Sequence, residues 1–190
     1  MPMGTLDILA EHIMQPIIYD VAVSIDGFVA GHDGDISQFA HDGAVVDDYF
    51  ARLSGYAVAI MGRRTYEFGY RFGLQPGANP YPNMETHVFS RSIDLPEDRA
   101  VAVIETLTRE YLDKLKKTAN GPIYLCGGGD FAGAVLELGL IDVLRLKRAP
   151  ILFGAGTRLF GGSCQTGTLT NTLSRRYENG YVFQEFEVRR

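Results

Sequence analysis

The sequence predicts an α/β protein in which a mostly parallel central sheet carries helices on both faces and ends in a C-terminal antiparallel hairpin. Short apolar runs with the composition of buried strands alternate along the chain with segments of helical spacing. Near the C-terminus the pattern changes to two strand-like runs, Leu169 to Ser174 and Tyr177 to Arg189, with the turn Glu178-Asn179-Gly180. A strand-helix-strand order builds a parallel sheet, because the helix returns the chain to the same end of the sheet.

The first half of the chain supplies two strands that are apolar on both faces. In the run from Ile17 to Ile25, Asp20 is the only charge, which indicates a central strand. A polar loop, residues 32–39, and a segment of helical spacing from Gly43 to Leu53 follow it. The second buried strand, Tyr56 to Met61, leads directly into a glycine and the start of a helix.

The middle of the chain continues the alternation. Residues 69–83 are rich in glycine, proline and aromatic residues and predict an irregular loop. Short strands are expected at Thr86 to Phe89 and Val101 to Ile104, and a helix with a basic end at Leu107 to Thr118. A strand beginning at Ile123 then stops at three glycines, and helical spacing runs from Ala132 to Ile141. The alternating residues from Asp142 to Arg148 predict a half-exposed strand.

Length and composition predict one domain. The chain has 190 residues, of which 46% are hydrophobic and 22% charged, and it contains no repeat. We expect a single domain over residues 17–190 and an N-terminal appendage over residues 1–16. The appendage has a possible helical turn from Leu6 to Met14 that Pro16 ends.

Several classes of function are disfavoured. The net charge of −5 argues against nucleic-acid binding, since there is no surplus of positive charge to neutralise phosphates. Cys126 and Cys164 do not make a disulfide framework, and the four histidines lack metal-ligand spacing, so no metal is expected. No apolar run reaches the roughly 18 residues of a membrane helix, and no signal peptide precedes the domain. We therefore expect a cytoplasmic protein with a small-molecule partner.

Three segments with phosphate-binding chemistry follow predicted strands. Glycines let a ligand approach the backbone, a helix N-terminus favours anions, and arginine forms bidentate bonds to phosphate. Parallel strands present their carboxyl ends at one edge, where ligands of such sheets bind. The residues concerned are Gly62, Arg63, Arg64 and Thr65, then Ser90 and Arg91, and finally Gly127, Gly128 and Gly129. Each segment alone also fits a turn without a ligand, or solvated arginines on a helix.

The order of these motifs resembles the dihydrofolate reductase-like superfamily. The segments are Ser24-Ile25-Asp26-Gly27-Phe28-Val29-Ala30, Met61-Gly62-Arg63-Arg64-Thr65-Tyr66-Glu67, the glycine triplet at 127–129 and Pro150-Ile151-Leu152-Phe153-Gly154-Ala155-Gly156. From Ile17 to Arg189 the chain is most similar to the reductase (C-terminal) domain of the riboflavin-biosynthesis deaminase–reductase and its stand-alone relatives. We expect no deaminase domain within the 190 residues. The resemblance implies a three-layer α/β sandwich of the dihydrofolate reductase type.

The resemblance also implies a cofactor and a reaction. NADPH would lie along the strand ends, with Gly62, Arg63, Arg64 and Thr65 at its phosphates, Ser90 and Arg91 at the adenosine ribose and 2′-phosphate, and the glycine triplet near the pyrophosphate and nicotinamide. The reaction would be hydride transfer to a ribosylaminopyrimidine of the riboflavin pathway or to a related pterin-like substrate. The protein would then align the reactants, exclude water and supply a proton.

Candidates for catalysis and substrate binding come from the same resemblance. Asp47 and Asp48 lie near the helix from which dihydrofolate reductases present a carboxylate, and solvated aspartates remain the alternative. Asp26 resembles a reductase-domain aspartate near the substrate, and it also fits a role in shaping the turn. Arg158 is the first candidate for binding a substrate phosphate, and Lys147 is the next.

Other functions remain to be separated from this one. A nucleotide-binding protein that has lost its substrate site would keep the fold and the cofactor. A Rossmann dehydrogenase is disfavoured because no Gly-x-Gly-x-x-Gly follows the first strand, and a P-loop phosphotransferase because Gly-Lys-Ser/Thr is absent. The apolar C-terminal hairpin predicts a contact edge and a homodimer.

Overall fold

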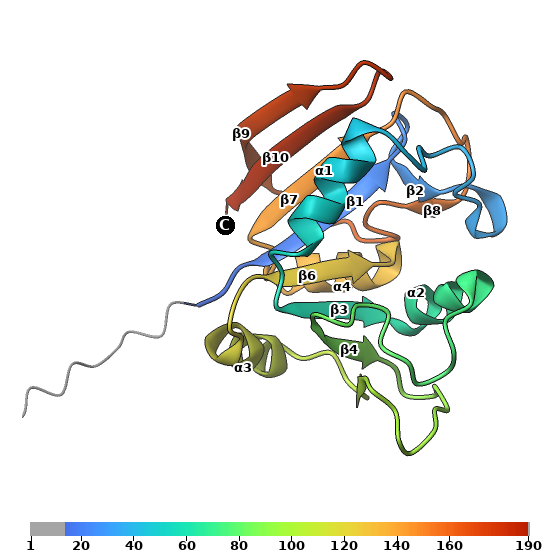
Figure 1. Ribbon diagram of the computed structural model, residues 1–190. Coiled ribbons are helices and arrows are strands. Elements are labelled where there is room, and N and C mark those ends of the chain that lie inside the picture. The colour runs from blue at the N-terminus through green and yellow to red at the C-terminus, as the bar shows by residue number, and fades with distance from the viewer. Residues whose placement is uncertain (1–13, 190) are drawn as a thin grey trace, which may run out of the picture.

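The computed structural model describes residues 14–189, and its centre is one twisted eight-stranded sheet (Figure 1). The strand order is β5-β4-β3-β6-β1-β7-β10-β9. Six of these strands are parallel, and β10 runs antiparallel to both of its neighbours. The strands are β1 (Ile17–Val23), β3 (Val58–Gly62), β4 (Glu85–Phe89), β5 (Ala102–Ile104), β6 (Ile123–Gly127), β7 (Val143–Arg148), β9 (Thr168–Arg176) and β10 (Val182–Arg189).

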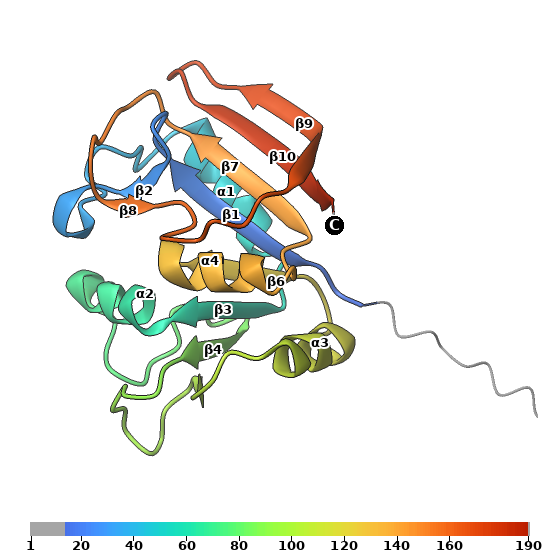
Figure 2. The ribbon, with the colours of Figure 1, turned by 180° about the vertical axis from the view of Figure 1, so that it is seen from behind.

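Helices cover both faces of the sheet, and the two ribbon views show α1 and α4 on opposite sides of it (Figures 1 and 2). The helices are α1 (Ala44–Leu53), α2 (Arg63–Phe68), α3 (Arg109–Thr118) and α4 (Gly129–Glu137). Short 3-10 turns, η1 (His32–Gly34) and η2 (Gly69–Phe72), flank the strand ends. This arrangement confirms the predicted mostly parallel α/β fold with an antiparallel C-terminal pair of strands.

Alternate residues of the central strands build a separate core on each face. Ile17, Ile60 and Ile123 pack with α3 and α4, whereas Ile18, Ala59 and Tyr124 pack on the other face. Because successive side chains of a strand point to opposite faces, a strand buried on both sides must be apolar throughout. Burial of the central strands on both faces explains the continuous apolar runs in the sequence.

The structure differs from the expected elements in three places. Helix α4 ends at Glu137 rather than near Ile141, because Gly139 takes a left-handed conformation with φ of 64°. Two short segments, β2 (Phe28–Ala30) and β8 (Thr157–Arg158), form an additional antiparallel ladder. Only β9 of the C-terminal pair lies at an edge, since β10 pairs with β7.

The predicted appendage lies largely outside the described residues, as does most of its expected helical turn. Gln15, at its end, donates its backbone N–H to the Lys116 carbonyl oxygen at 2.8 Å. Within residues 14–189, no helix is both long enough and apolar enough to cross a membrane.

Candidate functional site: a cleft at the strand ends

A cleft of about 800 Å³ opens at the carboxyl ends of β1, β3, β4 and β6. All three segments with phosphate-binding chemistry contribute to its wall, although they are far apart in the sequence. The lining includes Gly62 to Thr65 after β3, Ser90 to Ser92 after β4, and Gly128 to Phe131 after β6. The parallel sheet brings them together, because β3 lies between β4 and β6.

The glycine triplet makes the turn between β6 and α4. Gly127 has φ of 121°, a conformation that favours glycine, and the peptide bond to Gly128 is cis. A Cβ atom on Gly128 would lie 3.1 Å from Thr65 Oγ1, and one on Gly62 would lie 3.2 Å from Phe131 Cβ. The two strand-to-helix turns therefore fit against each other without room for side chains. Gly128 and Gly129 line the cleft, whereas Gly127 does not.

Four arginines give the cleft its charge: Arg63, Arg64, Arg71 and Arg91. Arg64 lies 3.6 Å from Asp130, but both side chains are largely exposed, so the pair is weak. Arg71 donates to the Asp33 carbonyl oxygen at 3.2 Å and stacks on Phe68, which joins the loop after β2 to helix α2. A concentration of guanidinium groups on an open surface suits phosphate oxygens.

Ser90 shapes the end of β4. Its hydroxyl oxygen accepts the backbone N–H groups of Ser92 at 3.1 Å and Ile93 at 2.9 Å. These bonds use only the acceptor side of the hydroxyl, so its proton is available to an acceptor in the cleft. Arg91 is exposed on the same turn.

The predicted catalytic carboxylates lie elsewhere. Asp26 accepts the Ser24 hydroxyl at 2.6 Å and the backbone N–H groups of Phe153 and Gly154, so it ties two loops together. The Ser24 hydrogen bond is the main cause that lowers the pKa of Asp26. Asp47 is exposed on α1, and Asp48 contacts Arg175 and Tyr177.

Neither cavity described here is lined by Asp26, Asp47 or Asp48, nor by Arg158 in β8. The structure therefore joins most of the predicted cofactor residues but not the predicted acids. Their catalytic and substrate-binding roles stay predictions.

Candidate functional site: a second cavity with an ionic floor

A second cavity of about 370 Å³ adjoins the cleft, and Val21 and Ile36 line both. Helix α1 contributes Val45, Val46, Tyr49 and Phe50 to its wall, and β1 and β7 contribute Asp20 and Lys147. Most of the wall is apolar or aromatic, so the two charged side chains stand out. A cavity of this size suits a small ring system.

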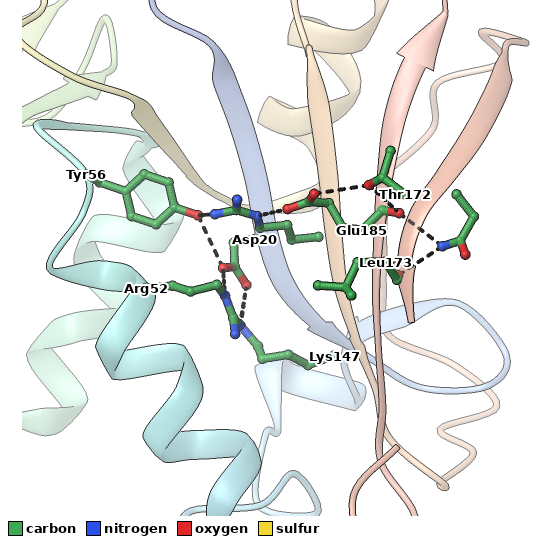
Figure 3. A network of polar contacts seen from close by, with 9 residues as sticks. Asp20, Arg52, Tyr56, Lys147, Thr172, Leu173 and Glu185 are labelled. Atoms are coloured by element: carbon green, nitrogen blue, oxygen red, sulfur yellow. Dashed lines mark hydrogen bonds and ion pairs between the residues drawn. The ribbon is translucent and has the colours of Figure 1, made fainter. Parts of the chain in front are cut away.

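Asp20 is the centre of a buried polar network (Figure 3). Its carboxylate accepts hydrogen bonds from Arg52 Nε at 2.8 Å, Lys147 Nζ at 2.9 Å and the Tyr56 hydroxyl at 3.2 Å. Burial by itself would raise the pKa of Asp20, but the Lys147 charge and the Arg52 hydrogen bond outweigh it and lower the pKa. Asp20 is therefore an anion held by two cations.

The network continues across the sheet toward β9. Arg145 donates to the Tyr56 hydroxyl at 3.0 Å and to Glu185 at 2.7 Å, and Thr172 donates to Glu185 at 3.0 Å. These contacts join β7, β10 and β9 to the network around Asp20 (Figure 3). The floor of the cavity is thus held by contacts from several strands and from α1.

Lys147 was the second candidate for binding a substrate phosphate, and it lines this cavity, but its pairing with Asp20 was not predicted. One signal for Asp20 is present in the sequence, because it is the only charge in an otherwise apolar central strand. A buried charge needs a partner, but the sequence does not indicate that the partner lies 127 residues away.

Comparison with known proteins agrees with this architecture. Residues 15–183 match the family RibD C-terminal domain, so the chain belongs to that family. Among curated proteins it is similar to YyaP of Bacillus subtilis (strain 168), described as an uncharacterized protein. The two are 28% identical over 177 residues, which is 87% of this chain and 91% of YyaP. YwjB, also described as uncharacterized and from the same organism, is 28% identical over 74% of this chain and 79% of its own length.

Solved structures share the fold. A putative riboflavin biosynthesis protein from Shewanella sp. PV-4 superposes with a TM-score of 0.77 at 24% identity, over 93% of this chain and all of the other. The Thermotoga maritima diaminohydroxyphosphoribosylaminopyrimidine deaminase/5-amino-6-(5-phosphoribosylamino)uracil reductase gives 0.71 at 14% identity, over 93% of this chain and 57% of that longer chain. A pyrimidine reductase-like protein from Corynebacterium diphtheriae gives 0.65 at 17%, over 93% and 92%. The dihydrofolate reductase-like fold expected from the motifs is confirmed.

Proposed function

We propose that the protein is an NADPH-dependent reductase that transfers a hydride to a ribosylaminopyrimidine or a related pterin-like substrate. The observation that carries the proposal is the juxtaposition of two cavities. An arginine-lined cleft runs along the strand ends, and a smaller cavity with an ionic floor opens beside it at Val21 and Ile36. A dinucleotide needs the first kind of site, and a small heterocycle needs the second.

The residues of the cleft fit a phosphorylated dinucleotide. Its volume of about 800 Å³ lies in the range of roughly 300–1,000 Å³ typical of ligand pockets. Side chains at Gly128 and Gly62 would crowd Thr65 and Phe131, so these turns leave backbone exposed where a pyrophosphate approaches. Helix α4, nine residues long, begins at Gly129 and directs free N–H groups toward the same space.

The 2′-phosphate is assigned to the end of β4. Arg91 is free to bind it, since none of the ion pairs among the described residues includes Arg91. Ser90 donates its unused hydroxyl proton beside it. A guanidinium at this place favours NADPH over NADH. Arg63 and Arg64 bind the remaining phosphates.

The chain itself supplies alignment and exclusion of water. The cofactor, when bound, supplies the hydride. Val21 and Ile36 lie at the junction of the two cavities. The carbon atoms that donate and accept the hydride would meet there. Apolar walls there keep water away from the reacting atoms.

The substrate class is supported by the family and by two structural neighbours. The Thermotoga maritima protein is described as a 5-amino-6-(5-phosphoribosylamino)uracil reductase, and the Corynebacterium diphtheriae protein as pyrimidine reductase-like. The second cavity has aromatic walls from Tyr49, Phe50 and Tyr124 that can stack on a planar ring. We extend this class to the present chain as part of the proposal.

The test is a titration of NADPH and NADH against wild type, Arg91→Ala and the control Arg176→Ala. Arg176 lies on β9, outside both cavities. We expect Arg91→Ala to weaken NADPH binding about 10- to 100-fold, the effect of one charge-assisted contact, and to leave NADH binding unchanged. Arg176→Ala should bind both nucleotides as wild type does.

Two outcomes would contradict the proposal. If the wild-type protein binds neither NADPH nor NADH, the proposal that it is a reductase is excluded. Wild type that binds NADPH but reduces neither 5-amino-6-(5-phosphoribosylamino)uracil nor dihydrofolate would instead support a nucleotide-binding protein without catalysis.

A further inference from the structure

The second cavity holds few groups able to donate a proton. Its titratable lining residues are Asp20, His41, Tyr49, Tyr124, Lys147 and Tyr181. His41 is exposed at the rim, with Nε2 3.3 Å from the Ser37 carbonyl oxygen. The Tyr181 hydroxyl accepts the Ala40 backbone N–H at 2.6 Å, on the wall formed by the loop before α1. Asp20, Lys147, Tyr49 and Tyr124 are the groups at the buried end.

Asp20 cannot be the donor. Its two carboxylate oxygens accept four hydrogen bonds, two from Arg52, one from Lys147 and one from Tyr56. Its side chain is 0% exposed, so no water competes for those positions. A carboxylate surrounded by donors in this way stays ionised and has no proton to give.

Tyr49 and Tyr124 are too weakly acidic to donate a proton. Burial raises the pKa of Tyr49, and burial also raises the pKa of Tyr124 far above its usual range. Their hydroxyl groups lie 2.7 Å apart and form a hydrogen bond to each other. Both are suited to packing and orientation rather than to proton transfer near neutral pH.

Lys147 has the geometry of a donor. Its side chain is 9% exposed and lines the cavity, with Nζ 2.9 Å from Asp20 Oδ1 and 3.5 Å from the centre of the Tyr49 ring. An ammonium group has three N–H bonds, of which Asp20 accepts one and the ring face contacts the cation. No further hydrogen bond from Nζ exists among residues 14–189, so a proton remains for a ligand in the cavity.

The surroundings of Lys147 change the pKa of its ammonium group. Burial lowers its pKa to about 8, against the opposing effect of Asp20 on β1. Arg52 on α1 lowers the pKa of Lys147 further, whereas Cys126 on β6 raises it. The usual pKa of lysine is about 10.4, so the shift brings the acid close to physiological pH, where general acids are most effective.

We propose that Lys147 is the proton donor of the reductase site. This inference rests on the proposed function and adds the residue that completes its chemistry. The carbon of a C=N or C=O bond gains the hydride, and the π electrons of that bond move to nitrogen or oxygen. That atom takes a proton from Lys147 Nζ, which becomes a neutral amine and regains a proton from solvent. The substrate is reduced by two electrons, and the nicotinamide is oxidised by two.

The same geometry narrows the substrate class. The atom that becomes protonated must lie at the buried end of the second cavity, within hydrogen-bond reach of Lys147 Nζ. The ring face then lies against Tyr49 and Tyr124, and the neighbouring carbon lies toward Val21 at the junction with the cleft. A planar heterocycle or imine with an acceptor atom next to the reduced carbon meets these conditions.

The test compares Lys147→Met, Lys147→Arg and Lys116→Met. Lys116 is the matched control, because it is also a buried lysine, 2.6 Å from Asp142, but it lies on α3 outside both cavities. Three quantities are measured: NADPH affinity, the pH profile of kcat for 5-amino-6-(5-phosphoribosylamino)uracil and dihydrofolate, and the ¹³C NMR titration of labelled lysines.

The proposal expects four results together. Lys147→Met keeps its NADPH affinity but loses kcat about 100-fold or more, the usual size of a general-acid effect. In wild type kcat falls above about pH 8, and this limb disappears in the Met variant. Lys147→Arg does not restore the rate, since arginine keeps the charge but does not release a proton. The lysine resonance that titrates near pH 8 is lost in Lys147→Met and retained in Lys116→Met.

Each opposite result overturns it. A Met variant with wild-type kcat and an unchanged pH profile excludes proton donation by Lys147, and rescue by Lys147→Arg reduces its role to charge. Failure of wild type to bind NADPH contradicts the proposed function instead, and the affinity measurement separates the two. If the Lys147 resonance titrates only near pH 10.4, the proposed role of Lys147 as proton donor is excluded, whether or not a substrate is found.

Discussion

Lys147 Nζ lies 2.9 Å from Asp20 Oδ1, although 127 residues separate the two in the sequence. The parallel pairing of β1 with β7 creates this contact, since Ala22 is opposite Lys147 and Asp20 opposite Arg145. Two of the three cationic residues of β7 therefore reach the carboxylate of the neighbouring strand, Lys147 directly and Arg145 through Tyr56. The register of β1 and β7 therefore determines which charged side chains meet at the floor of the second cavity.

Replacing Asp20 with asparagine should destabilise the fold. The substitution leaves the buried Lys147 and the half-buried Arg52 as cations without their anion, and breaking a buried pair costs about 3–5 kcal/mol. Chemical denaturation at pH 7 measures the loss in the free energy of unfolding. The control is Asp48→Asn, whose partner Arg175 is more than half exposed, and there we expect a loss of at most about 1 kcal/mol.

The pH dependence of the same contribution has a definite sign. The pKa of Asp20 is lower in the folded protein than in the unfolded chain, where it is about 3.9. The stabilisation is therefore fully present above pH 4 and is lost as the pH falls through the lower, folded-state pKa. Equal unfolding free energies for wild type and Asp20→Asn at pH 6 would contradict this assignment.

Substitutions in the glycine triplet should affect nucleotide binding and stability differently, depending on the position. A Cβ on Gly128 meets only the Thr65 side chain at 3.1 Å, whereas a Cβ on Gly129 would overlap the Arg158 backbone carbonyl oxygen. We expect Gly128→Ala to fold and to bind NADPH at least about 10-fold more weakly. Gly129→Ala should lose about 1–3 kcal/mol of stability, the usual cost of overpacking. Nucleotide titration and thermal unfolding of both variants check this, and the reverse pattern would count against the assignment.

The two cysteines should differ in reactivity. Burial raises the pKa of the Cys126 thiol, against the opposing effect of its hydrogen bonds to tyrosine, and the Tyr81 hydroxyl lies 3.2 Å from its sulfur. Cys164 is exposed. Since the thiolate is the nucleophile, iodoacetamide at pH 8 should modify Cys164 first, as peptide mass spectrometry would detect. NADPH should slow Cys126 further because this residue lines the cleft. Faster modification of Cys126 would show that its environment is not as described.

A homodimer through β9 is our proposal for the oligomeric state. Within the described chain β9 is an edge strand, paired on one side with β10, and it exposes Leu169 and Leu173. Light scattering should give twice the 21.0 kDa of one chain. Leu173→Arg should shift the protein to monomer, whereas Leu152→Arg, on an exposed loop, should not. A wild-type mass near 21.0 kDa over a wide concentration range would exclude the dimer.

Local patterns predicted most of the fold and most of the residues that line the arginine-rich cleft. Strand β1 and the turns after β3 and β6 could be found because apolar runs and glycines act over a few residues. Parallel strands then place such turns at one edge without further information. The short β2–β8 ladder was missed, since two or three residues carry no periodicity.

The proton donor that we propose could not be found in this way. Asp26, Asp47 and Asp48 were candidates because of their position in the chain, yet they line neither cavity. Strand register and packing across the sheet decide whether an ionisable side chain lies on the surface or at the bottom of a cavity. Lys147 was considered only as a second candidate for binding a substrate phosphate, and nothing local in the sequence indicates its burial beside Asp20.

The order of the strands also has a consequence for synthesis of the chain. Strand β1 pairs with β6 and β7, which follow it by more than a hundred residues. At about 5–20 residues per second, β1 leaves the ribosome roughly 5 to 25 seconds before both partners exist. During that time an apolar strand has two open edges, and the charge of Asp20 is the one feature within it that opposes pairing with other chains. The charge at the centre of the polar network in the folded protein is thus also the only charge that β1 carries before its partner strands exist.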